Sequence, residues 1–345
     1  MRIATLQYSP TLGSVSQNIL RANALLAATP LPERLDLLVL PELAFTGYNF
    51  PSLEAITPFL EPTAAGPSTQ WAIATATRLN CTVIVGYPER SQTPAATTAP
   101  DSTTDTAEPH PPSPKNYNSI VTIAPSGQVL ANYRKSFLYY TDETWASEGQ
   151  PHLSPPFFCA PLGSLCDGAA VGQGICMDIN PRRFTAPWHA YEFAHAMLAG
   201  RARLVVLSMA WLTRLLPDEL AMEPGRPDME TVAYWLERFN PLVAGLRAGE
   251  GEVIVVFANR CGIEGDVTGG VEVRGEVDGI VTGLVGMGDR ACYAGSSCVM
   301  RFQRGSVRMY ERGPDEVAIL GKGEEGCLVV DTEMPARFLL SHKTG

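Results

Sequence analysis

The sequence predicts an α/β fold built on a mixed sheet that helices largely cover. Three observations lead to this fold class. Short apolar runs typical of buried strands alternate along the chain with amphipathic runs typical of helices. A turn at Pro125-Ser-Gly127 joins two neighbouring strands, so the sheet is not purely parallel. The 345 residues, 45% of them hydrophobic, suffice for two ordinary domains or for one large α/β domain.

Each element of the first half follows from its local pattern. The segment from Arg2 to Tyr8 has the pattern of a strand. Ser14-x-x-Gln17 has the pattern of a capping box, and the apolar residues around it recur at helical spacing. The apolar run Leu35–Leu40 is stopped by Pro41, which favours a buried strand over a helix. We further expect a helix at 69–79, a buried strand at 81–87 and hairpin strands at 117–124 and 128–133.

The second half continues the same alternation. We expect strands near 171–176, 203–209 and 252–258, with helices near 190–199 and 229–246 between them.

Two stretches depart from this rhythm. Between Pro88 and Lys115 there is no Val, Ile, Leu, Met or aromatic residue, so this segment cannot bury enough surface to order itself. We predict one domain over residues 1–345, with a disordered insertion at about 91–115. The second stretch, Gly262–Gly288, is rich in glycine, and the alternation within 271–281 predicts a short exposed ribbon.

Composition excludes several functional classes. The formal net charge of −10 argues against a nucleic-acid partner, and the absence of an 18-residue apolar run argues against a membrane span. The first residues lack the layout of a secretory signal. Eight cysteines without any Cys-x-x-Cys spacing argue against structural zinc and against a dense disulfide framework. We therefore expect a soluble cytoplasmic protein with reduced thiols.

Cys176 is the first candidate for chemistry. It ends an apolar strand and is followed at once by the strand-breaking residues Asp178, Asn180 and Pro181, at the sheet end where α/β proteins place their sites. Only a few per cent of a free thiol is ionised at neutral pH, so a catalytic cysteine needs a base or a cation beside it. The alternative is a buried core thiol. None of the five histidines lies in a recognisable cysteine-protease context, which disfavours a papain-like pair.

Two charged residues could supply that base and that cation. Glu42 directly follows a buried strand, where desolvation raises the pKa of a carboxyl toward the range useful for proton transfer. Alternatively, Glu42 interacts with a helix dipole. Lys135 lies at the end of the second hairpin strand, where a solvated edge charge is the alternative.

Taken together, these motifs resemble the nitrilase (carbon–nitrogen hydrolase) superfamily. Pro41-Glu42-Leu with Thr46-Gly-Tyr48, then Tyr133-Arg-Lys135, then Gly174-Ile-Cys176-Met-Asp are similar to its Glu, Lys and Cys blocks and occur in its order. Later segments at 258–262 and 293–297 are also similar, so the resemblance covers nearly the whole chain. It implies a four-layer αββα sandwich with mixed sheets.

The resemblance also implies a chemistry. Cys176 attacks a carboxamide carbon, Glu42 accepts the thiol proton and later returns it to ammonia, and Lys135 stabilises the oxyanion. Glu143 occupies the position of a second active-site glutamate, and Glu42 or Glu143 activates the water that hydrolyses the thioester. No metal or organic cofactor is implied.

Within the superfamily, the segments at 174–181, 192–194, 207–212 and 296–299 are most similar to fungal-type protein N-terminal amidases. These enzymes convert N-terminal Asn and Gln of proteins to Asp and Glu and feed the N-degron pathway, so the implied partners are protein or peptide N-termini. Binding an α-ammonium group requires acids, for which Asp178 and Glu264 are the candidates. Met209 and Trp211 could line the pocket or fill the core.

Two other functions stay open at this point. One is a small-molecule amidase or nitrilase with the same chemistry, which would act on free amides rather than peptides. The other is a non-enzymatic scaffold, in which Cys176 would not react with thiol reagents faster than the other cysteines.

Overall fold

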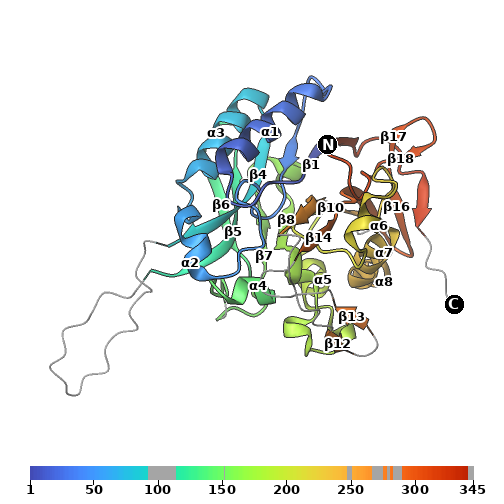
Figure 1. Cartoon of the computed structure of the whole chain (residues 1–345). Helices are drawn as coiled ribbons and strands as arrows, with labels where there is room; N and C mark the ends of the chain where they lie inside the picture. Colours follow the sequence, from blue (N-terminus) through green and yellow to red (C-terminus); the bar gives the residue numbers. More distant parts are fainter. Residues whose placement is uncertain are drawn as a thin grey trace, which may run out of the picture.

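The computed structural model describes residues 1–91, 114–150, 152–246, 251–265, 275–277, 280–282 and 290–340 (Figure 1). The predicted disordered insertion at about 91–115 falls almost wholly outside these residues. Within the glycine-rich stretch, β12 (Gly275–Val277) and β13 (Ile280–Thr282) pair antiparallel, as predicted for a ribbon. In the described part of the chain no helix combines the length and apolarity needed to cross a bilayer.

The first sheet is mixed. Its strands lie in the order β19 (Gly326–Asp331), β1 (Arg2–Gln7), β2 (Leu37–Val39), β4 (Thr82–Arg90), β5 (Asn116–Ile123), β6 (Val129–Arg134), with β3 (Glu61–Pro62) beside β4. β1, β2 and β4 are parallel, whereas β4, β5 and β6 form an antiparallel meander. Its β5–β6 hairpin is the one predicted from the turn at Pro125. The C-terminal strand β19 adds antiparallel to β1.

The second sheet repeats this plan. Its order is β20 (Phe338–Leu340), β16 (Ser306–Met309), β15 (Cys298–Gln303), β10 (Val253–Asn259), β9 (Leu204–Met209), β8 (Ala170–Ile175), β7 (Phe158–Pro161). The central strands β8, β9 and β10 are parallel, and the flanking strands are antiparallel.

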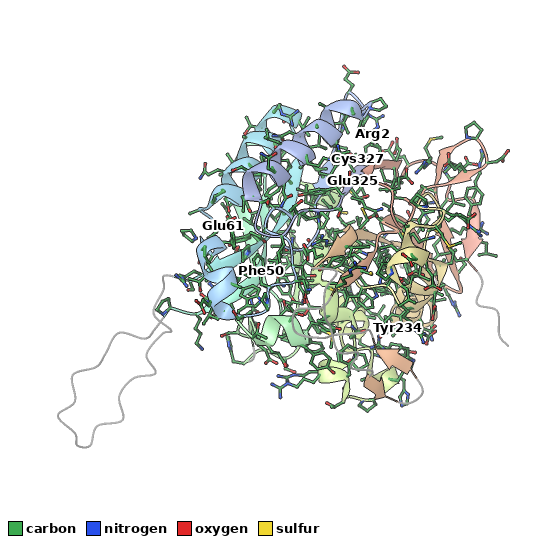
Figure 2. The ribbon with its side chains drawn as sticks, viewed as in Figure 1. Arg2, Phe50, Glu61, Tyr234, Glu325 and Cys327 are labelled. Atoms are coloured by element: carbon green, nitrogen blue, oxygen red, sulfur yellow. The ribbon has the colours of Figure 1, made fainter. Side chains whose placement is uncertain are left out.

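The two sheets pack face to face, and helices cover their outer faces (Figure 1). α1 (Val15–Ala28) and α3 (Pro67–Leu79) cover the first sheet; α5 (Glu192–Ala199), α7 (Met229–Arg238) and α8 (Asn240–Gly245) cover the second. Alternation along β2 sorts its side chains: Leu38 packs in the core under α1 and α3, whereas Leu37 and Val39 join the core of the second sheet. Side chains fill the space between these layers (Figure 2). The predicted αββα sandwich is confirmed.

One predicted helix is divided. The sequence pattern predicts a single helix over 229–246, but α7 ends at Arg238 and α8 begins at Asn240. Pro241 lies in the first turn of α8, where its missing N–H costs nothing, but in a continuous helix it would interrupt the hydrogen bonds.

The remaining elements are short and connect the layers. They are α2 (Leu53–Ile56), η1 (Thr57–Phe59), α4 (Tyr140–Glu143), η2 (Leu165–Gly168), η3 (Cys176–Ile179), η4 (Arg182–Phe184), η5 (Trp188–Ala190), α6 (Pro217–Ala221), β11 (Cys261–Glu264), β14 (Ala291–Ala294), β17 (Glu311–Gly313) and β18 (Glu316–Val317).

Candidate active site

The candidate nucleophile lies on a sharp turn at the end of a central strand. β8 ends at Ile175, and Cys176 begins the 3₁₀ turn η3 with φ at 38°. Residues other than glycine rarely adopt this left-handed backbone conformation. It is typical of strained strand-to-helix turns that expose a nucleophile. The side chain of Cys176 is 9% exposed, and it lines a cavity.

Asp178 holds this turn in place. Its carboxylate accepts hydrogen bonds from the backbone N–H groups of Ile175 (2.8 Å), Ser136 (3.1 Å) and Phe137 (2.8 Å), and from the Tyr133 hydroxyl (2.8 Å). Asp178 therefore joins the cysteine turn to the segment directly after Lys135. The prediction that it binds an α-ammonium group is wrong, because both carboxylate oxygens bind donors within the protein and the residue is fully buried.

Lys135 and Glu42 meet in the space between the two sheets. The Nζ of Lys135 donates to Glu42 Oε1 at 2.6 Å, and both side chains are fully buried. The second oxygen of Glu42 accepts from the backbone N–H of Ala210, just beyond β9, at 2.8 Å. The Glu42 turn rests on β4 at Gly86, where an added Cβ would come within 2.7 Å of three backbone atoms, so only glycine permits this approach.

Asp142, rather than Glu143, is the second carboxylate of this cluster. Asp142 Oδ2 accepts from Lys135 Nζ at 2.6 Å and is fully buried, whereas Glu143 is exposed. The two residues are adjacent on the single helical turn α4, where consecutive side chains point about 100° apart. The prediction for Glu143 was therefore off by one residue.

Asn118 completes the cluster and was not predicted. Its Nδ2 donates to Glu42 Oε1 at 2.6 Å and to Asp142 Oδ1 at 2.9 Å. Its amide thus bridges the two acids. Asn118 lies in the polar first half of β5, Asn116-Tyr-Asn-Ser119, where no local pattern singles it out.

Burial governs the pKa values of the cluster. Desolvation raises the pKa of Glu42, and the neighbouring Lys135 opposes this shift without cancelling it. Burial and then the charge of Glu42 raise the pKa of Cys176 well above its ordinary value, so the resting thiol is protonated. For Lys135, burial lowers the pKa, but the charges of Asp142 and Glu42 raise it more, and the side chain remains an ammonium.

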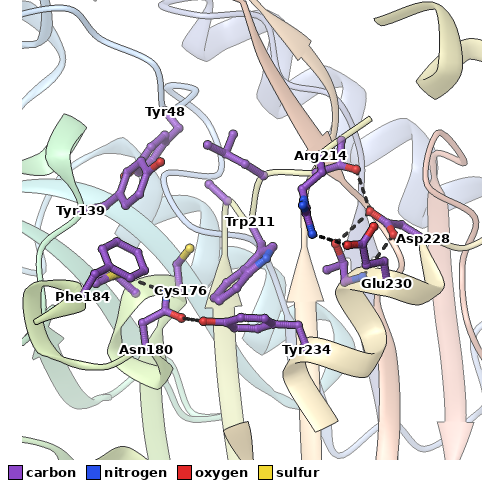
Figure 3. A pocket seen from close by; sticks show the side chains of 15 residues that line it. Tyr48, Tyr139, Cys176, Asn180, Phe184, Trp211, Arg214, Asp228, Glu230 and Tyr234 are labelled. Carbon is purple, nitrogen blue, oxygen red and sulfur yellow. Dashed lines mark hydrogen bonds and ion pairs between the residues drawn. The ribbon is translucent and has the colours of Figure 1, made fainter. Parts of the chain in front are cut away.

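Cys176 opens into a small cavity of about 150 Å³ (Figure 3). Its wall is mainly aromatic near the thiol and polar on the side of α7. The lining residues are Tyr48, Tyr139, Cys176, Met177, Asn180, Phe184, Ala210, Trp211, Leu212, Thr213, Arg214, Asp228, Glu230, Thr231 and Tyr234. Trp211 lies in this wall as predicted, but Met209 does not: it is fully buried as the last residue of β9 and packs in the core.

Asp228 and Glu230 are the carboxylates among the described residues of this wall, and Figure 3 shows Asp228 across the cavity from Cys176. Asp228 is nearly buried and accepts from Thr213 Oγ1 (2.7 Å), Thr231 Oγ1 (2.8 Å) and the N–H of Thr231 (3.1 Å), all neutral donors. Glu230 is 65% exposed and pairs with Arg214 at 2.5 Å.

Comparison with known proteins agrees with this geometry. Residues 2–299 match the family described as Carbon-nitrogen hydrolase. The chain belongs to the carbon–nitrogen hydrolase family. It is 29% identical over 348 residues to a protein N-terminal amidase of Schizosaccharomyces pombe, an alignment that covers 96% of this chain and 100% of the relative.

The fold of this carbon–nitrogen hydrolase is shared with solved N-terminal amidase structures. One, with an Asn-Glu-Ala peptide, has a TM-score of 0.68 at 21% identity and covers 96% of this chain and 97% of that one. Another, with a Gln-Val peptide, has a TM-score of 0.68 at 20% identity and covers 95% and 96%.

The acids on the wall of this hydrolase could not be found from sequence. Asp228 caps α7, and an Asp before a helix ordinarily indicates only an N-cap. Glu264, the other predicted ammonium-binding acid, is not in the cavity wall: it is buried on β11, where its carboxylate binds Arg260, Tyr293 and backbone N–H groups. That prediction is therefore wrong as well.

Proposed function

We propose that this chain removes the side-chain amide of Asn or Gln at the N-terminus of a peptide or protein, which yields Asp or Glu and ammonia. The observation that carries the proposal is the placement of a buried Cys176–Glu42–Lys135 cluster at one side of a small cavity with Asp228 at the other. The resemblance to N-terminal amidases, two of whose structures hold peptides that begin with Asn or Gln, supports the same substrate class.

In the first proposed step, Glu42 accepts the proton of the Cys176 thiol while the sulfur attacks the carboxamide carbon. Because the pKa of Cys176 is raised, proton transfer accompanies the attack and no resting thiolate is needed. Lys135 has three N–H bonds, and Glu42 and Asp142 accept two of them, so the third can face the oxyanion. The C–N bond then breaks, and Glu42 returns its proton to the leaving ammonia.

In the second step, water cleaves the thioester. Glu42, now ionised again, takes a proton from the water as its oxygen attacks the thioester carbon. The C–S bond breaks, Glu42 gives the proton that it took from water to the sulfur, and the carboxylic acid product leaves. Asp142 supports both steps because its charge keeps Lys135 an ammonium in a buried site.

Asp228 gives this chemistry its preference for a free N-terminus. Among the described residues, Asp228 accepts hydrogen bonds only from hydroxyl and amide donors and forms no ion pair, so its nearly buried charge is available to attract an ammonium group in the cavity. An acetylated terminus offers no positive charge and adds bulk, so we expect it to be rejected.

The test is ammonia release from short peptides that differ only in the first residue. We expect turnover of Asn- and Gln-initiated peptides, and none after N-acetylation or with the amide residue in position two. Asp228→Asn should raise KM for peptides at least about tenfold. The matched control is Asp218→Asn, an exposed acid of α6 outside the cavity. Equal rates on acetylated peptides or on simple aliphatic amides would instead indicate a small-molecule amidase.

We also propose that this reaction takes place in the cytoplasm and that it is a step of the N-degron pathway. A nucleophilic thiol must remain reduced to act, and all eight cysteines of the chain are free.

A further inference from the structure

Glu264 lies at the centre of a buried cluster beside the cavity. Its carboxylate pairs with Arg260 and accepts the Tyr293 hydroxyl at 2.6 Å, and Arg260 also stacks over the Tyr293 ring at 3.9 Å. The same carboxylate accepts the backbone N–H groups of Tyr48 (3.1 Å) and Asn49 (2.9 Å). A deeply buried ion pair contributes little net stability, because removing its charges from water is costly. We therefore ask what the contacts of Glu264 with residues 48–49 do for the cavity.

That other segment is the Tyr48 turn, which is held in one position. Gly47 has φ at 78°, and a Cβ there would come within 2.4 Å of Glu264 Oε1, so the turn and the carboxylate fit closely. Tyr48 is almost fully buried and lines the cavity, and its ring centroid lies 5.5 Å from Lys135 Nζ. Glu264 thus acts on the cavity through Tyr48.

The hydroxyl of Tyr48 is buried and has no hydrogen-bond partner within the described part of the chain. Leaving such a group unsatisfied destabilises the free protein. Burial first, and then the charges of Asp142 and Glu42, raise the pKa of this phenol well above its ordinary value, so it remains a neutral donor. Tyr48 and Cys176 line the same cavity, so a bound substrate could supply the acceptor that the Tyr48 hydroxyl lacks.

We propose that the Tyr48 hydroxyl is a further catalytic group, which donates a hydrogen bond to the side-chain carboxamide oxygen as that oxygen becomes the oxyanion, and that Glu264 is its positioning residue. The proposal rests on the proposed function. The charges explain why a neutral donor is useful here, because Glu42 and Asp142 already share one cation, Lys135. A second donor stabilises the oxyanion without another buried cation.

The test is Tyr48→Phe, which removes one oxygen and keeps the ring. We expect kcat for Asn- and Gln-initiated peptides to fall about a hundredfold, with KM changed less than about threefold. The melting temperature should stay the same or rise, because an unsatisfied hydroxyl is lost. The control is Tyr310→Phe, a buried tyrosine outside the cavity whose hydroxyl accepts from Arg301 at 3.0 Å; it should lower the melting temperature and leave kcat unchanged.

A second readout separates the oxyanion from the thiol. Methyl methanethiosulfonate transfers a methylthio group to Cys176 and releases methanesulfinate, and no oxyanion forms. Labelling of Cys176, followed by peptide mass spectrometry, should therefore proceed at the same rate in Tyr48→Phe and wild type. A kcat within about threefold of wild type, or a parallel loss of labelling, overturns the proposal. Absence of ammonia release by the wild-type protein would instead refute the proposed function.

The role of Glu264 is tested by a double-mutant cycle with Tyr48→Phe. Glu264→Gln, or the milder Tyr293→Phe that removes one donor from Glu264, should lower kcat in the wild-type background and have little further effect in Tyr48→Phe. Equal losses in both backgrounds would show that Glu264 acts independently of the Tyr48 hydroxyl.

Discussion

At the scale of single residues, the site depends on which of two adjacent acids faces Lys135. Asp142 does, at 2.6 Å from its Nζ, and Glu143 is exposed. Both acids follow Lys135 at nearly the same distance in sequence, seven and eight residues away, so spacing could not separate them. What decides is the direction of each side chain on the single turn α4.

This placement leads to a paired prediction. Asp142→Asn removes one of the two carboxylates on Lys135 and should lower kcat for Asn-initiated peptides by about 10²-fold or more. Glu143→Gln should leave kcat within about twofold of wild type. Steady-state kinetics of both variants decide the matter, and a larger loss in Glu143→Gln than in Asp142→Asn would contradict the assignment.

The pH dependence of kcat/KM follows from the same group of residues. Glu42 must be ionised to accept the thiol proton, and burial raises its pKa, so activity should fall on acidification at a pH above the ordinary glutamate pKa of about 4.3. Lys135 produces no loss near neutral pH because its pKa is raised. Above about pH 8 the peptide α-amino group itself loses its proton, and KM should rise. Full activity at pH 4 would exclude Glu42 as the base.

At the scale of elements, the sequence predicts strands better than it predicts the cavity. Buried strands such as β2, β8 and β9 are apolar runs with clear ends, and the residues that follow them, Glu42 and Cys176 among them, therefore converge at one edge of the two sheets. The helix that carries the polar wall was predicted without its break at Phe239. Its contribution to the site, Asp228 and Tyr234, depends on how α7 packs on the second sheet, which no local pattern encodes.

The two wrong assignments of ammonium-binding acids have the same physical origin. Asp178 and Glu264 are charged residues near family motifs, and sequence reasoning takes such charges to be available for ligands. In the fold, each carboxylate instead binds backbone N–H groups of the neighbouring segment, at 136–137 for Asp178 and 48–49 for Glu264. Their partners are distant in sequence, so only the tertiary structure reveals that both acids are occupied.

At the scale of the whole molecule, the fold and the order of its motifs follow from the sequence. Whether the low-complexity insertion can be shortened without loss of stability depends instead on how the structure holds its two ends. β4 and β5 pair as far as Arg90 with Asn116, and beyond them the N–H of Ser91 donates to the carbonyl of Lys115 at 2.8 Å. The two ends of the insertion therefore lie opposite each other. A short turn can close this pair of strands as a hairpin.

We therefore predict that residues 92–113 can be replaced by a short Gly-Ser link with little effect. Shortening a loop changes its closure entropy by only about 0.6 kcal/mol per halving, so the melting temperature should shift by no more than a few degrees. The kinetic readout is sensitive, because Asn118, which binds Glu42 at 2.6 Å, lies on β5 only two residues beyond Asn116. Circular dichroism melts and the kcat and KM for Asn- and Gln-initiated peptides check the outcome. A lost cooperative transition would show that residues 92–113 are needed for folding. A KM raised more than about tenfold with stability unchanged would show that they take part in forming the cavity.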